Sequence, residues 1–440
     1  MIVKGRSHAY HMGSDVLAFV LAGGRGTRLW PLTERRAKPL ICIAGKVNPL
    51  DIALSNLINS GIRKIGVLAG FGQNGLARHV AGLQMPGVEA VVLSPDYFPD
   101  ETGSVQGSYG GTADAVFQNM DLIRDTAAEY ILVVPGDGVY KADFAQIFAE
   151  LIKFDADAAI VTMRLPAAQA AGRFGVLDVD DMGVIREFIE KPPSPTGDAD
   201  GMCHVSAGMY LFKKSVIMHA LAADHHDTES SHDFGKNVIP MLIGNSHLSV
   251  IAYDLAYNVV PGEDPDTTCW WDIGSLEHLF AVLEDVTSVR PKLNLFNRKW
   301  PLISRPDNTG PMKHPPIGYD PARPRPAWWP RHEILSGYTA AGGCVIDPGS
   351  ILDRVSCGKW VQVATHCWLE RVIIEDGGIL GCGVRAKNVY VMDRAHIPDH
   401  ARVGFDRAED EANGCIVVQE SPDRTITVVP ANASWTAPRW

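Results

Sequence analysis

A glycine-rich run, Gly23-Gly24-Arg25-Gly26-Thr27-Arg28, follows an apolar segment that ends at Leu21-Ala22. Backbone N–H groups in a loop after a strand can cradle an anion, and the arginines add positive charge. The run is not a P-loop, because no Gly-Lys-Ser/Thr closes it, and the third glycine of a dinucleotide fingerprint is missing. Lys38 follows shortly after. These residues indicate phosphate binding; a plain turn with solvated basic residues is the alternative.

Two aspartates suit a divalent cation. Asp137 comes directly after the apolar run 130–135 and Gly136, and Asp272 stands within Trp-Trp-Asp-Ile-Gly-Ser. Mg2+ prefers one or two carboxylates together with phosphate oxygens. We therefore expect both aspartates to hold Mg2+, with a turn or helix-cap role as the alternative for either one.

Two further polar stretches compete for a functional role. Glu190-Lys191-Pro192 follows an expected strand, and a lysine there could bind a substrate phosphate as a point charge, unless it is simply exposed. The stretch 224–233 carries three histidines among acidic residues and could be read as a transition-metal site. Adjacent histidines in a polar stretch are more often solvated, so we interpret this stretch as solvated and not as a metal site.

The elements that must position these residues alternate along the first two thirds of the chain. Short apolar runs predict strands, and apolar residues three or four apart predict helices. The strands are expected at 16–21, 65–69, 90–93, 130–135, 158–163 and 184–189, and the helices at 49–60, 112–123, 144–152 and 276–283. This alternation predicts an α/β fold with a mainly parallel sheet. Ligands bind beyond the carboxyl ends of such strands, where the glycine run and Asp137 both fall.

The last third of the chain has a different character. Proline is dense from 291 to 330, which predicts an extended linker. From 341 to 404, apolar residues recur about every six positions with turn residues between them, which is typical of a parallel β-helix. A small antiparallel β-domain is the alternative. The expected divisions are a disordered extension (1–15), an α/β domain (16–290), a proline-rich linker (291–340), a β-helix (341–420) and a tail (421–440).

Composition excludes several classes of protein. The chain has 440 residues, enough for two or three domains, and its net charge of -11 argues against a nucleic-acid binder. Its eight cysteines form no C-x-x-C pair, which argues against a zinc ribbon or a thioredoxin-like site. Scattered, isolated cysteines in a large chain are typical of a reducing cytoplasm. No apolar run is long enough to span a bilayer, and residues 1–15 lack the apolar core of a signal peptide. We expect a cytoplasmic protein with no membrane or nucleic-acid partner.

The motifs, taken together and in order, resemble the sugar-nucleotide pyrophosphorylases, and most closely the bacterial glucose-1-phosphate adenylyltransferases (ADP-glucose pyrophosphorylases). The resemblance covers about Leu17 to Val418. Its most specific pieces are the runs 35–39 (Arg-Arg-Ala-Lys-Pro), 53–56 with 59–63, 111–116 (Gly-Thr-Ala-Asp-Ala-Val) and 230–236 (Ser-Ser-His-Asp-Phe-Gly-Lys).

This resemblance implies a Rossmann-like nucleotidyltransferase domain followed by a left-handed parallel β-helix. It also implies transfer of the AMP part of ATP to glucose 1-phosphate, with release of pyrophosphate and with Mg2+ as cofactor, for glycogen synthesis. Arg25, Arg28, Lys38 and Asp137 would be catalytic, and Asp137 and Asp272 would hold the metal. The nucleotide-binding residues would be Leu21, Ala22, Gly23, Gly24, Tyr109, Gly111 and Thr112. The sugar-phosphate pocket would consist of Gly175, Glu190, Lys191, Ser206, Gly208, Asp233, Phe234 and Trp270.

The resemblance further implies a homotetramer and small-molecule allosteric effectors, but the sequence departs from the family where such anions would bind. Lys46 is present, whereas Asn48 and Gly110 stand where relatives often carry arginines. Glu409-Asp410-Glu411-Ala412 replaces a region that is basic in relatives. The identity of any activator stays open.

Three other functions compete with this interpretation. The same chemistry could act on another sugar 1-phosphate or nucleotide. The chain could be a non-catalytic regulatory subunit, although such subunits lose the charged residues that are present here. Hexapeptide β-helices also serve acyltransferases, but His366 and His396 are isolated, so we interpret the β-helix as a domain for assembly and regulation.

Overall fold

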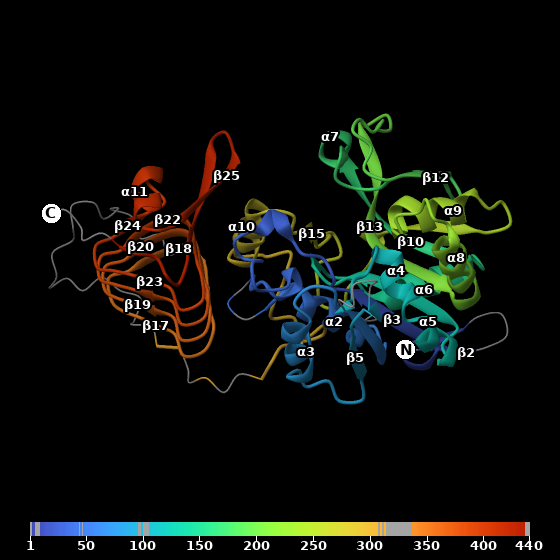
Figure 1. Cartoon of the computed structure of the whole chain (residues 1–440), viewed down its shortest axis with the longest axis horizontal. Helices are drawn as coiled ribbons and strands as arrows, with labels where there is room; N and C mark the ends of the chain where they lie inside the picture. Colours follow the sequence, from blue (N-terminus) through green and yellow to red (C-terminus); the bar gives the residue numbers. More distant parts are fainter. Residues whose placement is uncertain are drawn as a thin grey trace.

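The computed structural model describes residues 2–4, 9–43, 45, 47–95, 98–99, 105–306, 309, 312–313 and 337–435. They form an α/β domain and a β-helix, which lie next to each other with helix α10 (Leu276–Val286) between the two sheets (Figure 1). In the described part of the chain, no helix has the length and apolar character that crossing a membrane requires.

A nine-stranded sheet organises the α/β domain. Its main path runs β12-β11-β13-β8-β3-β4-β5, and β10 joins β13 to β14 beside this path. The predicted strands are present, with small shifts at their ends: β3 (Val16–Leu21), β4 (Lys64–Leu68), β5 (Glu89–Leu93), β8 (Tyr130–Pro135), β10 (Ala158–Pro166) and β12 (Ile185–Ile189). The sheet also contains β11 (Val176–Val179), β13 (Met202–Lys213) and β14 (Val250–Asp254). Strands β8, β3, β4 and β5 are parallel, whereas β13 runs antiparallel to both β8 and β10.

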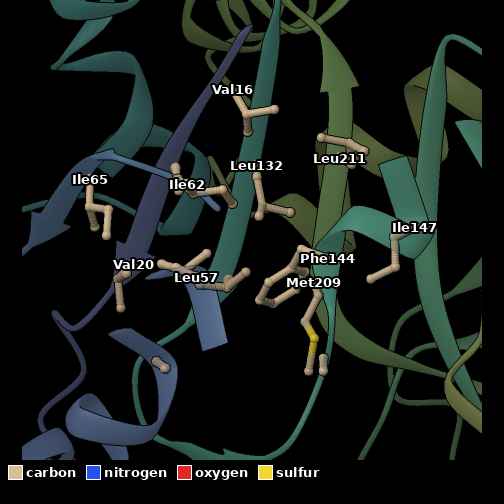
Figure 2. Close-up of a cluster of buried hydrophobic side chains, with 14 of the residues drawn as sticks. Val16, Val20, Leu57, Ile62, Ile65, Leu132, Phe144, Ile147, Met209 and Leu211 are labelled. Atoms are coloured by element: carbon tan, nitrogen blue, oxygen red, sulfur yellow. The ribbon is translucent and has the colours of Figure 1, made fainter. Parts of the chain in front are cut away.

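The central strand β3 is buried on both faces, as its continuous apolar sequence predicts. Val16, Ala18 and Val20 face one hydrophobic cluster, and Leu17 and Phe19 face another. Figure 2 shows the first cluster, where β3 and β8 side chains meet those of α2 (Pro49–Asn59) and α6 (Phe144–Lys153). Helices α4 (Thr112–Phe117) and α8 (Lys214–His226) contribute side chains to the second.

Helix boundaries follow local chemistry. Asn48 caps α2, because its Oδ1 accepts the Asp51 N–H at 3.0 Å, and Pro49 fills the first helical position. The helix expected at 112–123 is divided into α4 and α5 (Met120–Asp125). The prediction of one continuous helix was wrong because Asn119, at φ -114° and ψ 25°, leaves the helical region.

The C-terminal domain is the left-handed parallel β-helix. Val345 pairs with Gln362, Gln362 with Ile379 and Ile379 with His396, so each coil advances by 17 residues. One face stacks the two-residue strands β17 (Val345–Ile346), β19 (Gln362–Val363), β21 (Ile379–Leu380) and β23 (His396–Ile397). The adjoining sheet stacks β16 (Tyr338–Ala340), β18 (Ile351–Cys357), β20 (Trp368–Ile374) and β22 (Arg385–Val391), and β24 (Arg402–Val403) also pairs with β22.

The coils turn at left-handed backbone positions that recur with the same 17-residue spacing. Three columns of positive φ are present: Gly337, Arg354, Arg371 and Asn388; Gly343, Trp360, Gly377 and Arg394; Gly349, His366, Gly383 and His400. Three such corners in each coil give the six-residue beat of the sequence.

The structure moves the expected domain divisions at three places. Within 1–15, strands β1 (Ile2–Lys4) and β2 (Ala9–His11) pair and Met12 is buried, so a fully disordered extension is wrong for these residues. Residues 291–306 of the expected linker pack on the α/β domain, where the indole N–H of buried Trp300 donates to Asn56. The expected tail begins within a hairpin of β25 (Ile416–Ser421) and β26 (Arg424–Val429), and β26 pairs with β22. Most of the proline-rich part, at 314–336, lies outside the described residues.

Candidate active site

The glycine-rich loop leaves β3 at the carboxyl edge of the sheet. Gly23 approaches the neighbouring strand's loop so closely that an added Cβ would lie 3.2 Å from the Gly70 nitrogen. Gly26 adopts φ +62°, and its carbonyl accepts the Thr33 hydroxyl at 2.9 Å. A Cβ on Gly24 would meet no atom within 4 Å, and Arg25 and Arg28 are exposed. The loop therefore presents its backbone and both guanidinium groups to an open space.

Lys38 lies between the two aspartates. Its ammonium Nζ is 2.8 Å from Asp137 Oδ2 and 3.8 Å from Asp272 Oδ1, while the residue is only 7% exposed. The two carboxylates thus already face one cationic position. Oxygen donors of this kind fit Mg2+, which completes its coordination with phosphate oxygens and water.

Two short strands bring these aspartates together from distant parts of the chain. The Gly136 N–H donates to Leu21 O at 2.9 Å, which holds Asp137 beside the start of the glycine loop. Strand β9 (Gly138–Tyr140) pairs antiparallel with β15 (Trp270–Asp272), so that Asp272 stands opposite Gly138. The spacing in sequence gave no indication of this pairing.

Arg28 and Asp272 both lie beside Gly274, because a Cβ there would be 3.2 Å from Arg28 Nη1 and 3.1 Å from Asp272 Oδ2. Arg173 was not predicted from the sequence; its Nη2 is 4.0 Å from Asp272 Oδ2. Its position two residues before Gly175, which is implicated in sugar binding, was the available signal.

His278, also missed, accepts the Gly274 N–H at Nδ1 over 3.3 Å. Burial lowers its pKa, and the nearby Arg173 guanidinium lowers it further.

Several of the residues expected to bind the sugar phosphate lie near Glu190. A Cβ on Gly175 would lie 2.9 Å from Glu190 Oε2, and one on Gly235 would lie 2.5 Å from the same oxygen, so both glycines leave room for this carboxylate. Lys191 Nζ is 2.9 Å from Glu190 Oε1, and more than half of its side chain is exposed. The Ser206 N–H donates to Gly175 O at 2.8 Å, and Trp270 packs against Phe174 with ring centroids 5.3 Å apart.

Asp233 connects Thr112 to the turn Phe234–Val238. Its Oδ1 caps the π-helical turn Phe234–Val238 by accepting two backbone N–H groups, and its Oδ2 accepts the Thr112 hydroxyl at 3.0 Å. Gly111 is required there, because a Cβ would lie 2.1 Å from His232 O. Phe234 is 1% exposed and packs on Tyr210, so its side chain belongs to the core.

Tyr109 lies beside the glycine loop. A Cβ on Gly23 would be 3.7 Å from its ring, and its hydroxyl donates to Leu93 O at 3.1 Å. Gly208, at φ +74°, lies two residues after Ser206, and its N–H donates to Ser206 Oγ at 3.2 Å.

In the competing histidine stretch, the first aspartate has a structural role. Asp224 is buried, and its two oxygens bind Ser230 Oγ at 2.6 Å and His232 Nδ1 at 2.9 Å. Within the described ranges, no group of three or more His, Cys, Asp or Glu side chains could hold a metal ion.

Fold and site together define a nucleotidyltransferase. Residues 17–289 match the family described as "Nucleotidyl transferase", and residues 331–429 match "GlmU-like, C-terminal hexapeptide".

Similar proteins carry the name glucose-1-phosphate adenylyltransferase. One, from Teredinibacter turnerae, is 33% identical over 96% of this chain and 96% of its own length. Relatives with the same name from Gemmatimonas aurantiaca and Bradyrhizobium diazoefficiens are each 35% identical, over 91% and 90% of this chain and 93% and 91% of their own lengths. The chain belongs to the glucose-1-phosphate adenylyltransferase family of sugar-1-phosphate nucleotidyltransferases.

Proposed function

We propose that this protein converts ATP and α-D-glucose 1-phosphate into ADP-glucose and pyrophosphate, and so supplies a glucosyl donor for glycogen or another α-glucan. The observation that supports this most is the convergence of the glycine loop, Lys38, Asp137 and Asp272 at one edge of the sheet. The name shared by relatives that match nearly the whole chain supports the choice of ATP and glucose 1-phosphate.

The reaction needs positioned charge more than a general base. A phosphate oxygen of the sugar phosphate, already ionised, forms a bond to the α-phosphorus of ATP, and the bond to the β-phosphate oxygen breaks. The electron pair leaves with pyrophosphate. Arg25, Arg28 and Lys38 would neutralise the triphosphate, and Lys191 would bind the sugar phosphate. Asp137 and Asp272 would hold Mg2+, which supplies charge neutralisation at the phosphate oxygens when it is bound.

Residues around the sugar would fix its orientation. Glu190 presents a carboxylate that can accept hydrogen bonds from sugar hydroxyls, and Gly175 and Gly235 keep the space around it clear. Trp270, two residues before Asp272, packs against Phe174, and we propose that this aromatic pair lines the sugar pocket. We propose the same place for Ser206, Gly208 and Asp233.

A homotetramer and control by small-molecule effectors are further proposals, which rest on family resemblance alone. A non-catalytic subunit is the second candidate for function. It is disfavoured because Arg25, Lys38, Asp137, Lys191 and Asp272 are all present.

The experiment is a substrate panel. Purified protein with Mg2+ would be given each of several nucleoside triphosphates with glucose 1-phosphate, and ATP with several sugar 1-phosphates, while pyrophosphate is measured. We expect the highest kcat/KM for ATP with glucose 1-phosphate. A higher value for another pair would reassign the substrate, and no pyrophosphate from any pair would favour the non-catalytic subunit.

A further inference from the structure

The β-helix contacts the α/β domain in two places near the aspartate pair. The first contact involves Arg36, two residues before Lys38. The second contact involves α10, which begins four residues after Asp272. Both segments carry residues of the site described above. Their contacts with the β-helix are made by side chains that the reaction itself does not use.

The first contact is a partly buried ion pair, in which Glu375 is buried and Arg36 is half-buried. Arg36 binds both carboxylate oxygens of Glu375: Nη1 contacts Oε1, and Nη2 donates to Oε2 at 3.1 Å. Such bidentate pairs fix direction as well as distance. Glu375 is held in turn by the Tyr390 hydroxyl at 2.6 Å and the Asp393 N–H at 2.9 Å. Burial alone would lower the pKa of Arg36, but the Glu375 carboxylate raises it above its ordinary value.

The chain after Lys38 rests on the β-helix too. Gly45, at φ +75°, lies so close to the corner after β18 that a Cβ would be 2.7 Å from Cys357 O. The segment 36–45 is therefore held by the β-helix at two places, with Lys38 between them.

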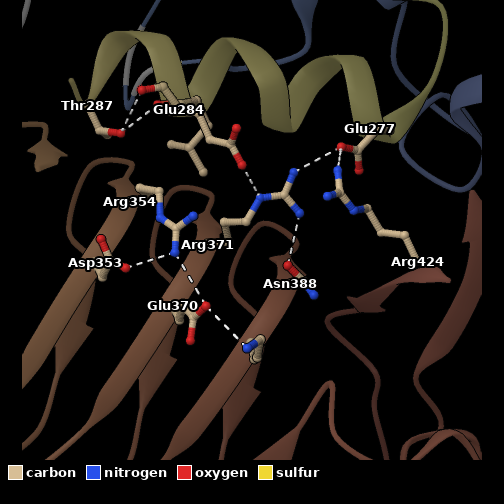
Figure 3. A network of polar contacts seen from close by, with 11 residues as sticks. Glu277, Glu284, Thr287, Asp353, Arg354, Glu370, Arg371, Asn388 and Arg424 are labelled. Carbon is tan, nitrogen blue, oxygen red and sulfur yellow. Dashed lines mark hydrogen bonds and ion pairs between the residues drawn. The ribbon is translucent and has the colours of Figure 1, made fainter. Parts of the chain in front are cut away.

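The second contact is made with α10, as Figure 3 shows. Arg371 occupies a left-handed corner of β20, is 5% exposed, and contacts Glu277 at 3.1 Å as well as Glu284. Arg424, from the hairpin, contacts Glu277 as well. Glu420 accepts the Leu276 N–H at 3.1 Å, which places a carboxylate at the N-terminus of the helix.

We propose that Glu375 and Glu420 are positioning residues for nucleotidyl transfer. Glu375 fixes the loop that carries Lys38, and Glu420 fixes the helix that follows Asp272. The β-helix thereby sets the distance between Lys38 and the two carboxylates. This inference rests on the proposed function for its kinetic consequences, but not for its structural ones.

Glu375→Gln tests the first contact, because glutamine keeps the shape and one acceptor oxygen but loses the charge that faces Arg36. We expect kcat to fall by about 10- to 100-fold, as for a small misplacement of catalytic groups. The Mg2+ concentration for half-maximal rate should rise. KM for glucose 1-phosphate should change less than about twofold, since Lys191 and Glu190 lie outside the two segments that contact the β-helix.

Glu420→Ala tests the second contact by removing the partly buried carboxylate that accepts the Leu276 N–H. Glu370→Gln is the matched control for Glu375→Gln. It removes a carboxylate from the same strand as Arg371, but among the described residues the ion-pair partners of Glu370 are Arg354 and Lys387, both within the β-helix. The control should keep the wild-type kcat and Mg2+ dependence.

Hydrogen exchange supplies a readout that needs no substrate. In Glu375→Gln, backbone amides of 26–43 should exchange several-fold faster while those of 276–286 stay protected. Glu420→Ala should show the reverse pattern, and Glu370→Gln should show neither.

Unchanged exchange over 26–43 in Glu375→Gln, with an unchanged Mg2+ dependence, would overturn the proposal. Uniformly faster exchange with an unchanged Mg2+ requirement would mean a purely structural role and would overturn it as well. A wild-type protein that forms no pyrophosphate would refute the proposed function. The exchange pattern would still test whether Glu375 and Glu420 hold the two segments in place.

Discussion

Lys38 links the two acidic residues of the site. Its ammonium lies 2.8 Å from Asp137 and 3.8 Å from Asp272, in a position where a divalent cation could serve the same carboxylates. A buried ammonium needs such partners, because desolvation without them is costly. The lysine therefore keeps both carboxylates directed at one point before any ligand arrives.

Asp137→Asn should reduce Mg2+-dependent turnover by at least about 10²-fold, comparable to the loss of one positioned charge in an active site, while the protein stays folded. The measurement is pyrophosphate release over a range of Mg2+ concentrations, with circular dichroism as the check on folding.

Asp227→Asn is the matched control, since Asp227 is exposed, lies in the histidine stretch and uses only one oxygen to accept the Glu229 N–H. It should be fully active. Near-normal turnover in Asp137→Asn would refute the metal assignment, and a loss in the control would revive the histidine stretch as a site.

Lys191→Ala should raise KM for glucose 1-phosphate by about 10- to 100-fold, because a hydrogen bond to a charged group contributes about 1.5–3 kcal/mol. KM for ATP should change far less, since Lys191 pairs with Glu190 on the sugar side of the site. Initial rates with each substrate varied in turn decide this. Equal effects on the two KM values would contradict the assigned role.

Residue types and local runs indicated Lys38, Asp137 and Asp272 as candidates, and the structure brings these three side chains together. Arg173 and His278 were missed, since their place beside Asp272 depends on the pairing of β9 with β15. Phe234 was expected in the pocket, but its side chain packs in the core. In the turn that begins at Phe234, Asp233 accepts the backbone N–H groups of Gly235 and Lys236.

At the scale of elements, α10 connects the site to the second domain. Ser275 caps its first turn, Glu420 lies at its N-terminus, and its apolar face is buried in the cluster shared with the β-helix. His278, on its first turn, accepts the Gly274 N–H and faces Arg173. The start of this helix is thus sensitive to the protonation of one side chain.

Acid should weaken the start of α10 through His278. Its folded-state pKa lies below the ordinary value of 6.5, so in the window just below pH 6.5 the unfolded chain binds a proton that the folded chain does not. This contribution to the free energy of unfolding is complete above pH 6.5 and is lost as pH falls through that window. Thermal unfolding at several pH values should show a smaller decrease in Tm toward acid for His278→Gln than for the wild type. Parallel pH profiles would contradict this.

The strands of the sheet were largely predictable because burial on both faces requires continuous apolar runs. The long strand β13 was not predicted, since its polar residues Ser206 and His204 interrupt the pattern. The break between α4 and α5 and the hairpin of β25 and β26 also escaped prediction, because a backbone angle at Asn119 and a pairing with β22 decide them.

At the scale of the whole molecule, one hydrophobic cluster crosses between the domains. It joins Leu279, Phe280 and Leu283 of α10 to Ile373, Tyr390, Ile426 and Val428 of the C-terminal domain. The periodicity of the β-helix predicted its coils but could not show that one face would be covered by another domain. The shared cluster implies that the two domains stabilise each other.

Ile373→Ala should lower the free energy of unfolding by about 2–5 kcal/mol, because the side chain is 2% exposed and its removal leaves a cavity. The loss should appear in the α/β domain too, as a lower Tm for the same transition. Ile379→Ala, at a residue that is 40% exposed on another face of the β-helix, is the control and should change stability by less than about 0.5 kcal/mol. Separate calorimetric transitions, with only one shifted in Ile373→Ala, would show that the domains unfold independently.

The most direct test of the central claim is isotope exchange in the reverse direction. Purified protein with Mg2+, ADP-glucose and labelled pyrophosphate should form labelled ATP and glucose 1-phosphate in equal amounts. Asp137→Asn should form neither. A labelled nucleoside triphosphate that forms only from a different nucleotide sugar, and not from ADP-glucose, would contradict the assignment of ATP and glucose 1-phosphate as substrates.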